Sequence, residues 1–214
     1  MKTEKSNRVI VALVSISLLV LLSGCGPGMQ AGGDIARGRQ AMFAQNYQGA
    51  LGYFQNAQQI DPSYIYGTEL QAGVLSYLGR AQYLVGQLAP ARDSLQKALA
   101  QMKSDNVARL YLGLTLARQG DRTAGLRDIE AGMKGISAFL NYITTTFGST
   151  FGQFWDPAQS IRKAISNSLT MVAGGNFDWG ALITQGEQIG INIEQEPDRA
   201  REQEEQQREM EFGK

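Results

Sequence analysis

Residues 34–62 read DIARGRQAMFAQNYQGALGYFQNAQQIDP, and this stretch decides the fold. It predicts two helices joined by a short turn, and Asp61-Pro62 closes the second helix because a proline disfavours helical backbone in the residue before it. This order of small and large residues lets two antiparallel helices approach closely while an aromatic ring fills the space beside them. The residues concerned are the small Gly38, Ala50 and Ala57 and the large Phe54.

The same order of small and large residues occurs twice more along the chain. The second copy is Gly79, Ala91, Leu95 and Ala98, and the third is Gly113, Gly125, Ile129 and Gly132. Equivalent positions are 41 residues apart between the first two copies and 34 apart between the last two. The additional residues correspond to about two helical turns, so we expect an insertion that lengthens a helix and keeps its apolar face in place.

A helix–turn–helix of 34 residues with Gly, Ala, a large apolar residue, Ala and Pro in this order resembles a tetratricopeptide repeat. Asp34 and Leu75 stand where the family has an early tryptophan, and Gly125 and Gly132 stand where alanine is usual. The resemblance implies an all-α fold, a short right-handed α-solenoid of about three helix pairs with C-terminal capping helices. The alternative is an ordinary helical bundle.

The N-terminus of the chain predicts export. Lys2, Lys5 and Arg8 precede an apolar run from Val9 to Leu22, which is shorter than the roughly 20 residues that a membrane-spanning helix needs. A basic start, a short apolar segment and small residues after it are typical of a secretory signal. We therefore assign residues 1–24 to a signal peptide.

The end of this signal, Leu22-Ser23-Gly24-Cys25, resembles a bacterial lipobox, in which the cysteine is acylated with fatty acids such as palmitate after cleavage. The resemblance implies covalent lipid on Cys25 as the only attached group, with no further cofactor. It also implies a protein anchored in the bacterial cell envelope and facing the periplasm, in the outer rather than the inner membrane because Gly26 replaces Asp. The alternative is an ordinary signal followed by a chance cysteine.

The rest of the chain divides by its local patterns. The Gly-rich residues 25–33 predict a flexible tether, and Asp34 then offers an N-cap for the first helix. Residues 34–143 hold the repeats, in which we expect one long helix over residues 63–85. The last repeat helix continues as an apolar stripe, which either caps the array or packs against another chain. The stripe is Leu126, Ile129, Met133, Ile136, Leu140 and Ile143.

The character of the sequence changes after this stripe. Residues 144–156 are rich in glycine, threonine and aromatic residues and predict a loop. Its aromatic residues either plug the end of the array or form a partner-binding lip; they are Phe147, Phe151, Phe154 and Trp155. Residues 157–195 predict capping helices with N-caps at Asp156 and Asp178, and residues 196–214 predict a solvated, charged, partly helical tail.

The composition argues against most catalytic chemistry. The chain has no histidine, and its one cysteine is the predicted acylation site, which removes His- and Cys-dependent nucleophilic sites and the commonest zinc ligands. The sequence contains neither a phosphate-binding glycine loop nor a dinucleotide fingerprint. A formal net charge of zero gives no reason to expect nucleic acid. We therefore expect a protein that is not an enzyme and that binds no metal.

The candidate binding surface follows from the resemblance, because the first helix of each tetratricopeptide pair lines a concave groove. Mapping that pattern onto this chain gives the candidate groove residues Arg39, Phe43, Tyr77, Arg80, Tyr83, Tyr111 and Arg118. Tyrosine and arginine are favoured at binding surfaces because they combine large contact areas with fixed hydrogen-bonding groups. The alternative is that Tyr77 and Tyr83 only pack between helices while the arginines are solvated.

These expectations lead to a membrane-anchored periplasmic scaffold or adaptor that binds a protein or peptide partner in an envelope assembly or secretion system. One alternative is a solute-binding accessory lipoprotein of a transport system, with a small molecule held between tyrosine and arginine side chains. An enzyme of the envelope would need two carboxylates facing each other in a cleft, which the sequence does not indicate. The sequence predicts no oligomeric state.

Overall fold

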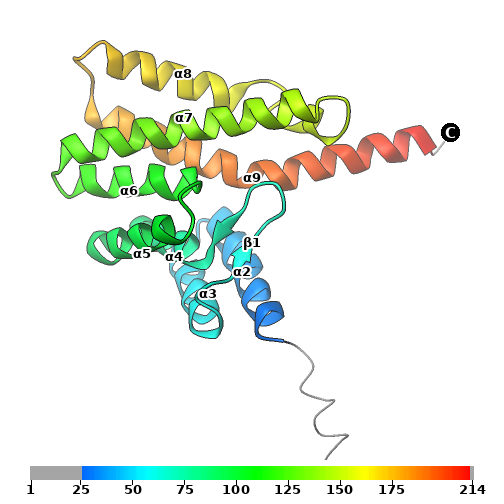
Figure 1. Ribbon diagram of the computed structural model, residues 1–214, viewed down its shortest axis with the longest axis horizontal. Helices are drawn as coiled ribbons and strands as arrows, with labels where there is room; N and C mark the ends of the chain where they lie inside the picture. The colour runs from blue at the N-terminus through cyan, green and yellow to red at the C-terminus, as the bar shows by residue number, and fades with distance from the viewer. Residues whose placement is uncertain (1–25, 213–214) are drawn as a thin grey trace, which may run out of the picture.

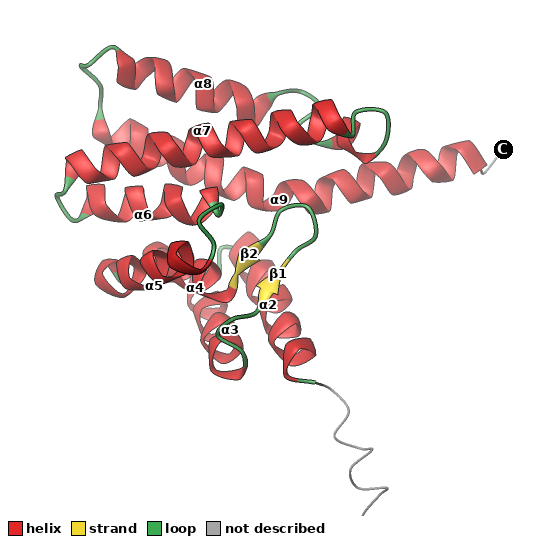
Figure 2. Ribbon diagram, viewed as in Figure 1, coloured by secondary structure: helices red, strands yellow, loops and turns green. Residues whose placement is uncertain are grey.

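A computed structural model describes residues 26–212, whose regular elements are helices apart from two short strands (Figures 1 and 2). The predicted signal peptide and Cys25 lie outside this range. The elements are α2 (Pro27–Phe43), α3 (Tyr47–Ile60), β1 (Ile65–Tyr66), β2 (Ala72–Gly73), α4 (Val74–Leu84), α5 (Leu88–Gln101), α6 (Asn106–Arg118), α7 (Arg122–Thr146), the 3₁₀ helix η1 (Phe151–Phe154), α8 (Ser160–Ala173) and α9 (Trp179–Phe212). The prediction of an all-α fold is confirmed.

Three consecutive helix pairs, α2–α3, α4–α5 and α6–α7, pack against one another in chain order (Figure 1). In each pair a glycine of the first helix lies against a large residue of the second, so the predicted close approach is confirmed. An added Cβ would overlap that residue in every pair: at Gly38 it would lie 2.4 Å from the Phe54 ring, at Gly79 2.6 Å from Cγ of Leu95, and at Gly113 2.4 Å from the backbone nitrogen of Ile129.

The insertion between the first two pairs forms a β-hairpin, so the helix expected over residues 63–85 is wrong in its first half. The strands β1 and β2 pair antiparallel, and helix begins only at Val74. Residues 64–66 read Tyr-Ile-Tyr, which favour extended backbone. Gly67 then turns the chain at φ +99°, a conformation that side chains larger than glycine rarely adopt.

The Gly-rich segment 25–33 is helical from Pro27 onward, so the prediction of a flexible tether is wrong. Proline suits the first turn of a helix because the N–H group that it lacks would have no hydrogen-bond partner within the helix there. Glycine serves close packing instead, since an added Cβ at Gly32 would lie 2.6 Å from a tyrosine hydroxyl beside the hairpin. Asp34 therefore lies inside α2, where it pairs with Arg37 at 2.6 Å, and is not the predicted N-cap.

The 25-residue helix α7 carries the predicted apolar stripe, which is buried from Ile129 to Ile143. It runs to Thr146, three residues into the predicted 144–156 loop. The aromatic residues after it fold back against α7, where Trp155 is 2% exposed and meets Phe139 edge to face at 5.6 Å. This packing is the plug that was one of the two alternatives for the loop.

Helix α8 begins at Ser160 and not at the predicted Pro157, because Asp156 and Gln159 both adopt positive φ angles outside the helical region. Asp156 still caps α8 from four residues away. Its carboxylate accepts hydrogen bonds from the backbone nitrogen of Ile161 at 3.0 Å and from that of Arg162 at 3.2 Å.

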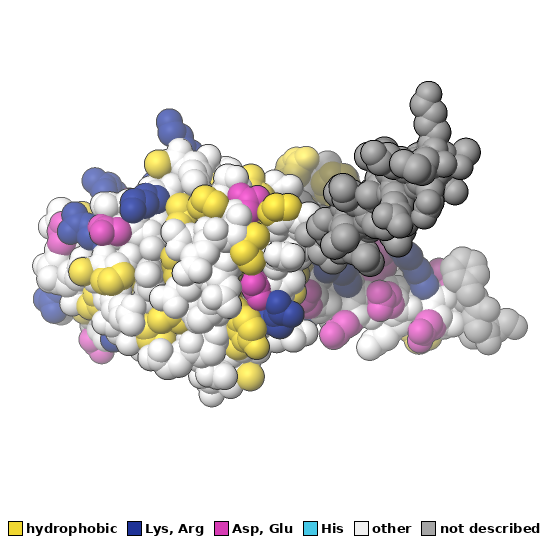
Figure 3. Space-filling view, turned by 90° about the horizontal axis from the view of Figure 1, so that it is seen from below, with side chains coloured by type: hydrophobic (Ala, Val, Ile, Leu, Met, Phe, Trp, Pro, Cys, Tyr) yellow, Lys and Arg dark blue, Asp and Glu magenta, His cyan; other side chains and the backbone are white. Residues whose placement is uncertain are grey.

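Helix α9 continues to Phe212, so the predicted 196–214 tail is an ordered helix as far as the structure describes it. Pro197 lies inside α9 without ending it, because the turn around it is buried and Glu196 there accepts a hydrogen bond from the backbone nitrogen of Asp156 at 2.5 Å. The end of α9 projects past the body in Figure 1 and shows acidic side chains in Figure 3. Within residues 26–212, no helix is both long and apolar enough to cross a membrane.

Candidate functional site

The candidate groove residues lie on α2, α4 and α6, and their partner is the C-terminal helix α9 of the same chain. We call the side of α2, α4 and α6 that carries Arg39, Arg80, Tyr83 and Tyr111 the groove face. Side-chain hydrogen bonds join Glu194 of α9 to Arg39 of α2, which is 155 residues away in the sequence, and to Arg80 of α4, which is 114 residues away. The predicted residues therefore do converge, and the chain itself fills the space in front of them.

Glu194 of α9 is the centre of the contact. One of its carboxylate oxygens accepts a hydrogen bond from Nε of Arg39 at 2.5 Å, and the other accepts one from Nη1 of Arg80 at 2.8 Å. Arg39 also donates to the backbone oxygen of Glu194 at 2.9 Å and to Asp198 at 2.8 Å. The side chains are almost fully enclosed, with 4% of Glu194, 1% of Arg80 and 9% of Arg39 exposed.

The electrostatics keep this cluster ionised. Burial by itself would raise the pKa of Glu194, but the positive charges of Arg80 and Arg39 more than offset it and hold that pKa below its usual value. The same carboxylate raises the pKa of both arginines against the opposing effect of their burial. The alternative in which the groove arginines are solvated is therefore wrong for Arg39 and Arg80, whereas Arg118 is exposed.

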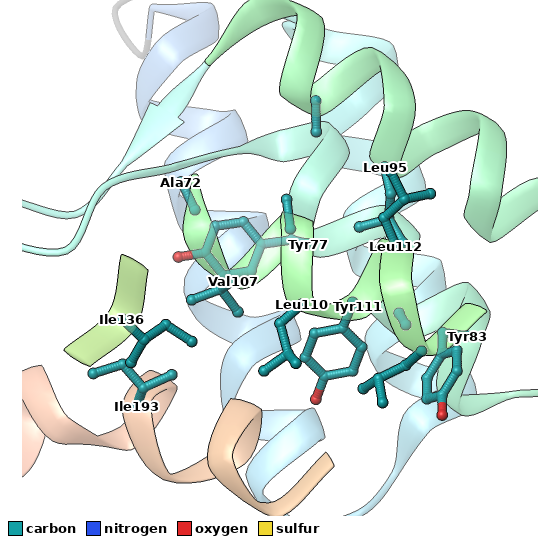
Figure 4. Packing of buried hydrophobic residues seen from close by; sticks show 14 of the residues in the cluster. Ala72, Tyr77, Tyr83, Leu95, Val107, Leu110, Tyr111, Leu112, Ile136 and Ile193 are labelled. Atoms are coloured by element: carbon teal, nitrogen blue, oxygen red, sulfur yellow. The ribbon is translucent and has the colours of Figure 1, made fainter. Parts of the chain in front are cut away.

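Aromatic rings line the groove face beside the charges (Figure 4). The guanidinium of Arg80 lies over the Tyr77 ring at 4.5 Å from its centre, a cation–π arrangement. Tyr111 of α6 is 1% exposed, and Figure 4 shows its hydroxyl pointing toward α9. These rings remove water from around the ion pairs, which strengthens the electrostatic attraction.

A second polar contact lies one pair further along the groove face. The hydroxyl of Tyr83 donates to Glu187 of α9 at 2.5 Å, and Arg118 lies 3.6 Å from the same carboxylate. Arg118 also stacks over the Tyr83 ring at 4.9 Å. Burial and the hydrogen bond to Glu187 raise the pKa of Tyr83. The hydroxyl therefore keeps its proton at physiological pH and remains a hydrogen-bond donor.

Helix α9 approaches the groove face at two glycines. An added Cβ at Gly186 would lie 2.8 Å from Leu114, and one at Gly190 would lie 2.5 Å from the Tyr111 ring. Gly186, Gly190 and Glu194 are four residues apart and therefore lie on one side of α9. Sequence reasoning missed Glu194 as the partner of Arg39 and Arg80, although its four-residue spacing from Gly190 and Gly186 was present in the sequence.

Phe43 lies at the rim of the groove face. It is half-buried, and the guanidinium of Arg39 stacks over its ring at 5.3 Å. A recess of about 360 Å³ opens beside it between α2 and α9, with Tyr66 and Asp198 in its wall. Of the seven predicted residues, α9 leaves two open: Phe43 is half-buried, and 41% of the Arg118 side chain is exposed.

Three buried polar groups near the ion pairs lack hydrogen-bond partners among the described residues. They are Nε and Nη2 of Arg80, Oγ of Ser76 and Oδ2 of Asp105. Arg80 thus uses one of its three nitrogens, although a buried unpaired donor costs about 1–3 kcal/mol. Helix α9 therefore satisfies the groove face incompletely.

A cavity of about 280 Å³ lies under the β-hairpin at the end of the groove face. Its walls include Arg39 and Tyr77 of the groove face, Glu194 and Asp198 of α9, and Tyr66 of β1. Its charged groups are already paired with one another. Within residues 26–212, no three carboxylates, histidines or cysteines come together in a way that could hold a metal ion.

Comparison with protein-family models, with curated proteins and with solved structures finds no significant match to this chain.

Proposed function

We propose that this protein is a lipid-anchored, non-enzymatic scaffold of the bacterial periplasm, built from tetratricopeptide-like helix pairs, that binds a protein or peptide partner in an envelope assembly or secretion system. The observation that carries the proposal is the groove face, where residues from three successive helix pairs converge to hold a helix through its carboxylates. Aromatic and arginine side chains gathered on one face are typical of protein-binding sites.

The solenoid form of the proposal rests on the repeated packing of a small against a large residue in three helix pairs. Each such pair buries its apolar side only when it stacks on a neighbour. Helix α8, which packs on α7, and helix α9, which packs on α6, then cover the last pair.

The membrane anchor of the proposal is Cys25, which lies outside the described residues. Helix α2 begins at Pro27, two residues later. If Cys25 is acylated, the first helix pair lies directly against the lipid surface. Two acyl chains or more would hold it stably, since a single chain binds only marginally.

The test is photo-crosslinking in native membranes. A crosslinking amino acid at Phe43, on the open rim of the groove face, should give adducts with a protein partner. The same amino acid at Asn167, on the exposed side of α8, is the matched control and should not. Repeated absence of a protein adduct at Phe43 would contradict the proposal.

A second candidate is the solute-binding accessory lipoprotein, which the 280 Å³ cavity favours. Pockets that enclose small molecules are typically about 300–1,000 Å³, so this cavity is at the small end of that range. A small molecule that co-purifies with the protein and is lost on substitution of Tyr66 would support this candidate over the scaffold.

A further inference from the structure

We propose that the groove face recognises a helix with two small residues one turn apart and a carboxylate one turn later, and that α9 is an internal ligand displaced by a partner helix of this pattern. The inference rests on the proposed function and names the class of partner. In α9 the pattern is Gly186, Gly190 and Glu194.

The geometry of the contact defines the pattern. At Gly186 and Gly190 the groove face touches helix backbone, and an added side chain would overlap Leu114 or Tyr111. One turn later, Arg39 and Arg80 converge on a single carboxylate. A helix with large residues at the first two places or an amide at the third does not fit, so the face is selective.

The contact is built for selectivity more than for strength. Where a permanent core helix would place leucine, α9 places two glycines, and its large side chains buried between Trp179 and Glu194 are Leu182, Ile189 and Ile193. The rest of the contact includes the ion pairs of Glu194, and a buried ion pair often contributes no more stability than apolar residues of the same volume because of the cost of desolvation. The ion pairs and glycines therefore define which helix fits more than they add to stability.

The groove face also has hydrogen-bonding capacity that α9 leaves unused. Nε and Nη2 of the buried Arg80 have no partner within residues 26–212. Glu194 divides its two oxygens between two arginines, so it cannot bind either one bidentately. A partner helix with a further acceptor beside its carboxylate would satisfy these donors and compete with α9.

The chain connectivity permits the exchange. Helix α9 is the last element that the structure describes, so its departure unthreads none of the other described elements. The linker before it, residues 174–178, is largely exposed and contains Gly174 and Gly175, the latter at φ +77°. Such a short tether gives α9 an effective concentration on the order of millimolar, so a partner must bind tightly or be held at the same membrane.

The experiment places a protease site in residues 174–178 of the full chain and cuts it after folding. A fluorescent synthetic peptide of residues 179–214 is then added, and its binding is followed by anisotropy. We expect the labelled peptide to replace the cut α9. A peptide with Glu194→Gln, or one with Gly190→Leu, should bind about 100-fold more weakly or worse. A peptide with Thr184→Ala, an exposed position, should bind like the unmodified one.

A second measurement uses the uncut chain. Full-length Glu194→Gln protein should bind the unmodified peptide at least tenfold more tightly than wild type does, because its own α9 is loosened. The matched control is Glu205→Gln, an exposed glutamate on the same helix, which should bind like wild type. This measurement decides the question if the cut protein aggregates.

Three results would overturn the inference. The first is that the cut α9 does not exchange while the protein stays folded. The second is that the Glu194→Gln peptide binds as well as the unmodified peptide. The third is that the uncut chain forms dimers that exchange α9, because a second copy of the chain would then be the occupant. If exchange fails while Phe43 still crosslinks to a protein, the inference falls and the proposed function stands.

Discussion

Gly113 of α6 is the most sensitive test of the helix-pair packing. An added Cβ there would lie 2.4 Å from the backbone nitrogen of Ile129, 2.7 Å from the carbonyl oxygen of Gly125 and 2.8 Å from the carbonyl carbon of Asp128. All three atoms belong to the backbone of α7, which cannot rotate away as a side chain can. The substitution Gly113→Ala must therefore push α6 and α7 apart.

The expected loss of stability is the balance of two effects. Overpacking of a core costs about 1–3 kcal/mol, and the upper part of this range applies because backbone must move. Alanine recovers about 1 kcal/mol through its better helix propensity. We therefore expect Gly113→Ala to lower the free energy of unfolding by about 1–2 kcal/mol.

Gly52→Ala on α3 is the matched control, because an added Cβ at that helical glycine meets nothing within 4 Å. It should raise stability by about 0.5–1 kcal/mol. Urea unfolding followed by circular dichroism measures the free energy of unfolding of both variants, and in thermal unfolding their melting temperatures should differ by roughly 5–10 °C. If the two variants are equally stable, the close packing of α6 on α7 is wrong.

Three further outcomes are expected. Glu194→Gln should lower the free energy of unfolding by about 3 kcal/mol at neutral pH, since the buried Arg80 loses its counter-charge and Arg39 keeps only that of Asp198. Because the folded-state pKa of Glu194 lies below its usual 4.5, the stabilisation by its carboxylate is complete above that pH and is lost as the pH falls through the folded-state value. The difference between wild type and variant in urea unfolding should therefore shrink below pH 4.5, and a constant difference would count against an ionised cluster. Asp156→Ala should cost about 2 kcal/mol by the same assay, because α8 loses its cap and Arg162 its buried partner; Asp178→Ala, at an exposed cap, should cost less. Cys25→Ser should leave the protein unprocessed or released from membranes on fractionation, and recovery with the membrane like wild type would refute lipid as the anchor.

Local pattern predicted much of the fold. The spacing of small and large residues gave three helix pairs, and the three- and four-residue spacing of apolar residues gave the long helix α7, because both depend on which side of a helix a residue occupies. The sequence pattern predicted the wrong structure where the same composition is compatible with two structures. The glycines of residues 25–33 indicate a tether when solvated and a close contact when packed, and here Gly32 packs against a tyrosine.

The candidate site was half predictable. The sequence placed Arg39, Tyr77, Arg80, Tyr83 and Tyr111 on one face of the first repeat helices. Arg39 and Arg80 occupy equivalent positions 41 residues apart, and Tyr77 and Tyr111 occupy equivalent positions 34 residues apart. It did not show what lies against that face. Arg39 and Glu194 are 155 residues apart, and no local rule relates them.

The sequence by itself determined the helices, their pairing through small residues and the predicted lipid attachment, because these depend on periodicity and short motifs. The tertiary structure alone decided that the inserted residues form a hairpin and that α9 crosses the groove face before it continues as a helix into the exposed, charged residues 201–211. The physical reason is that a charged, glycine-containing helix is stable there only when Arg39 and Arg80 neutralise Glu194 in a buried site. That compensation exists only after distant parts of the chain have come together.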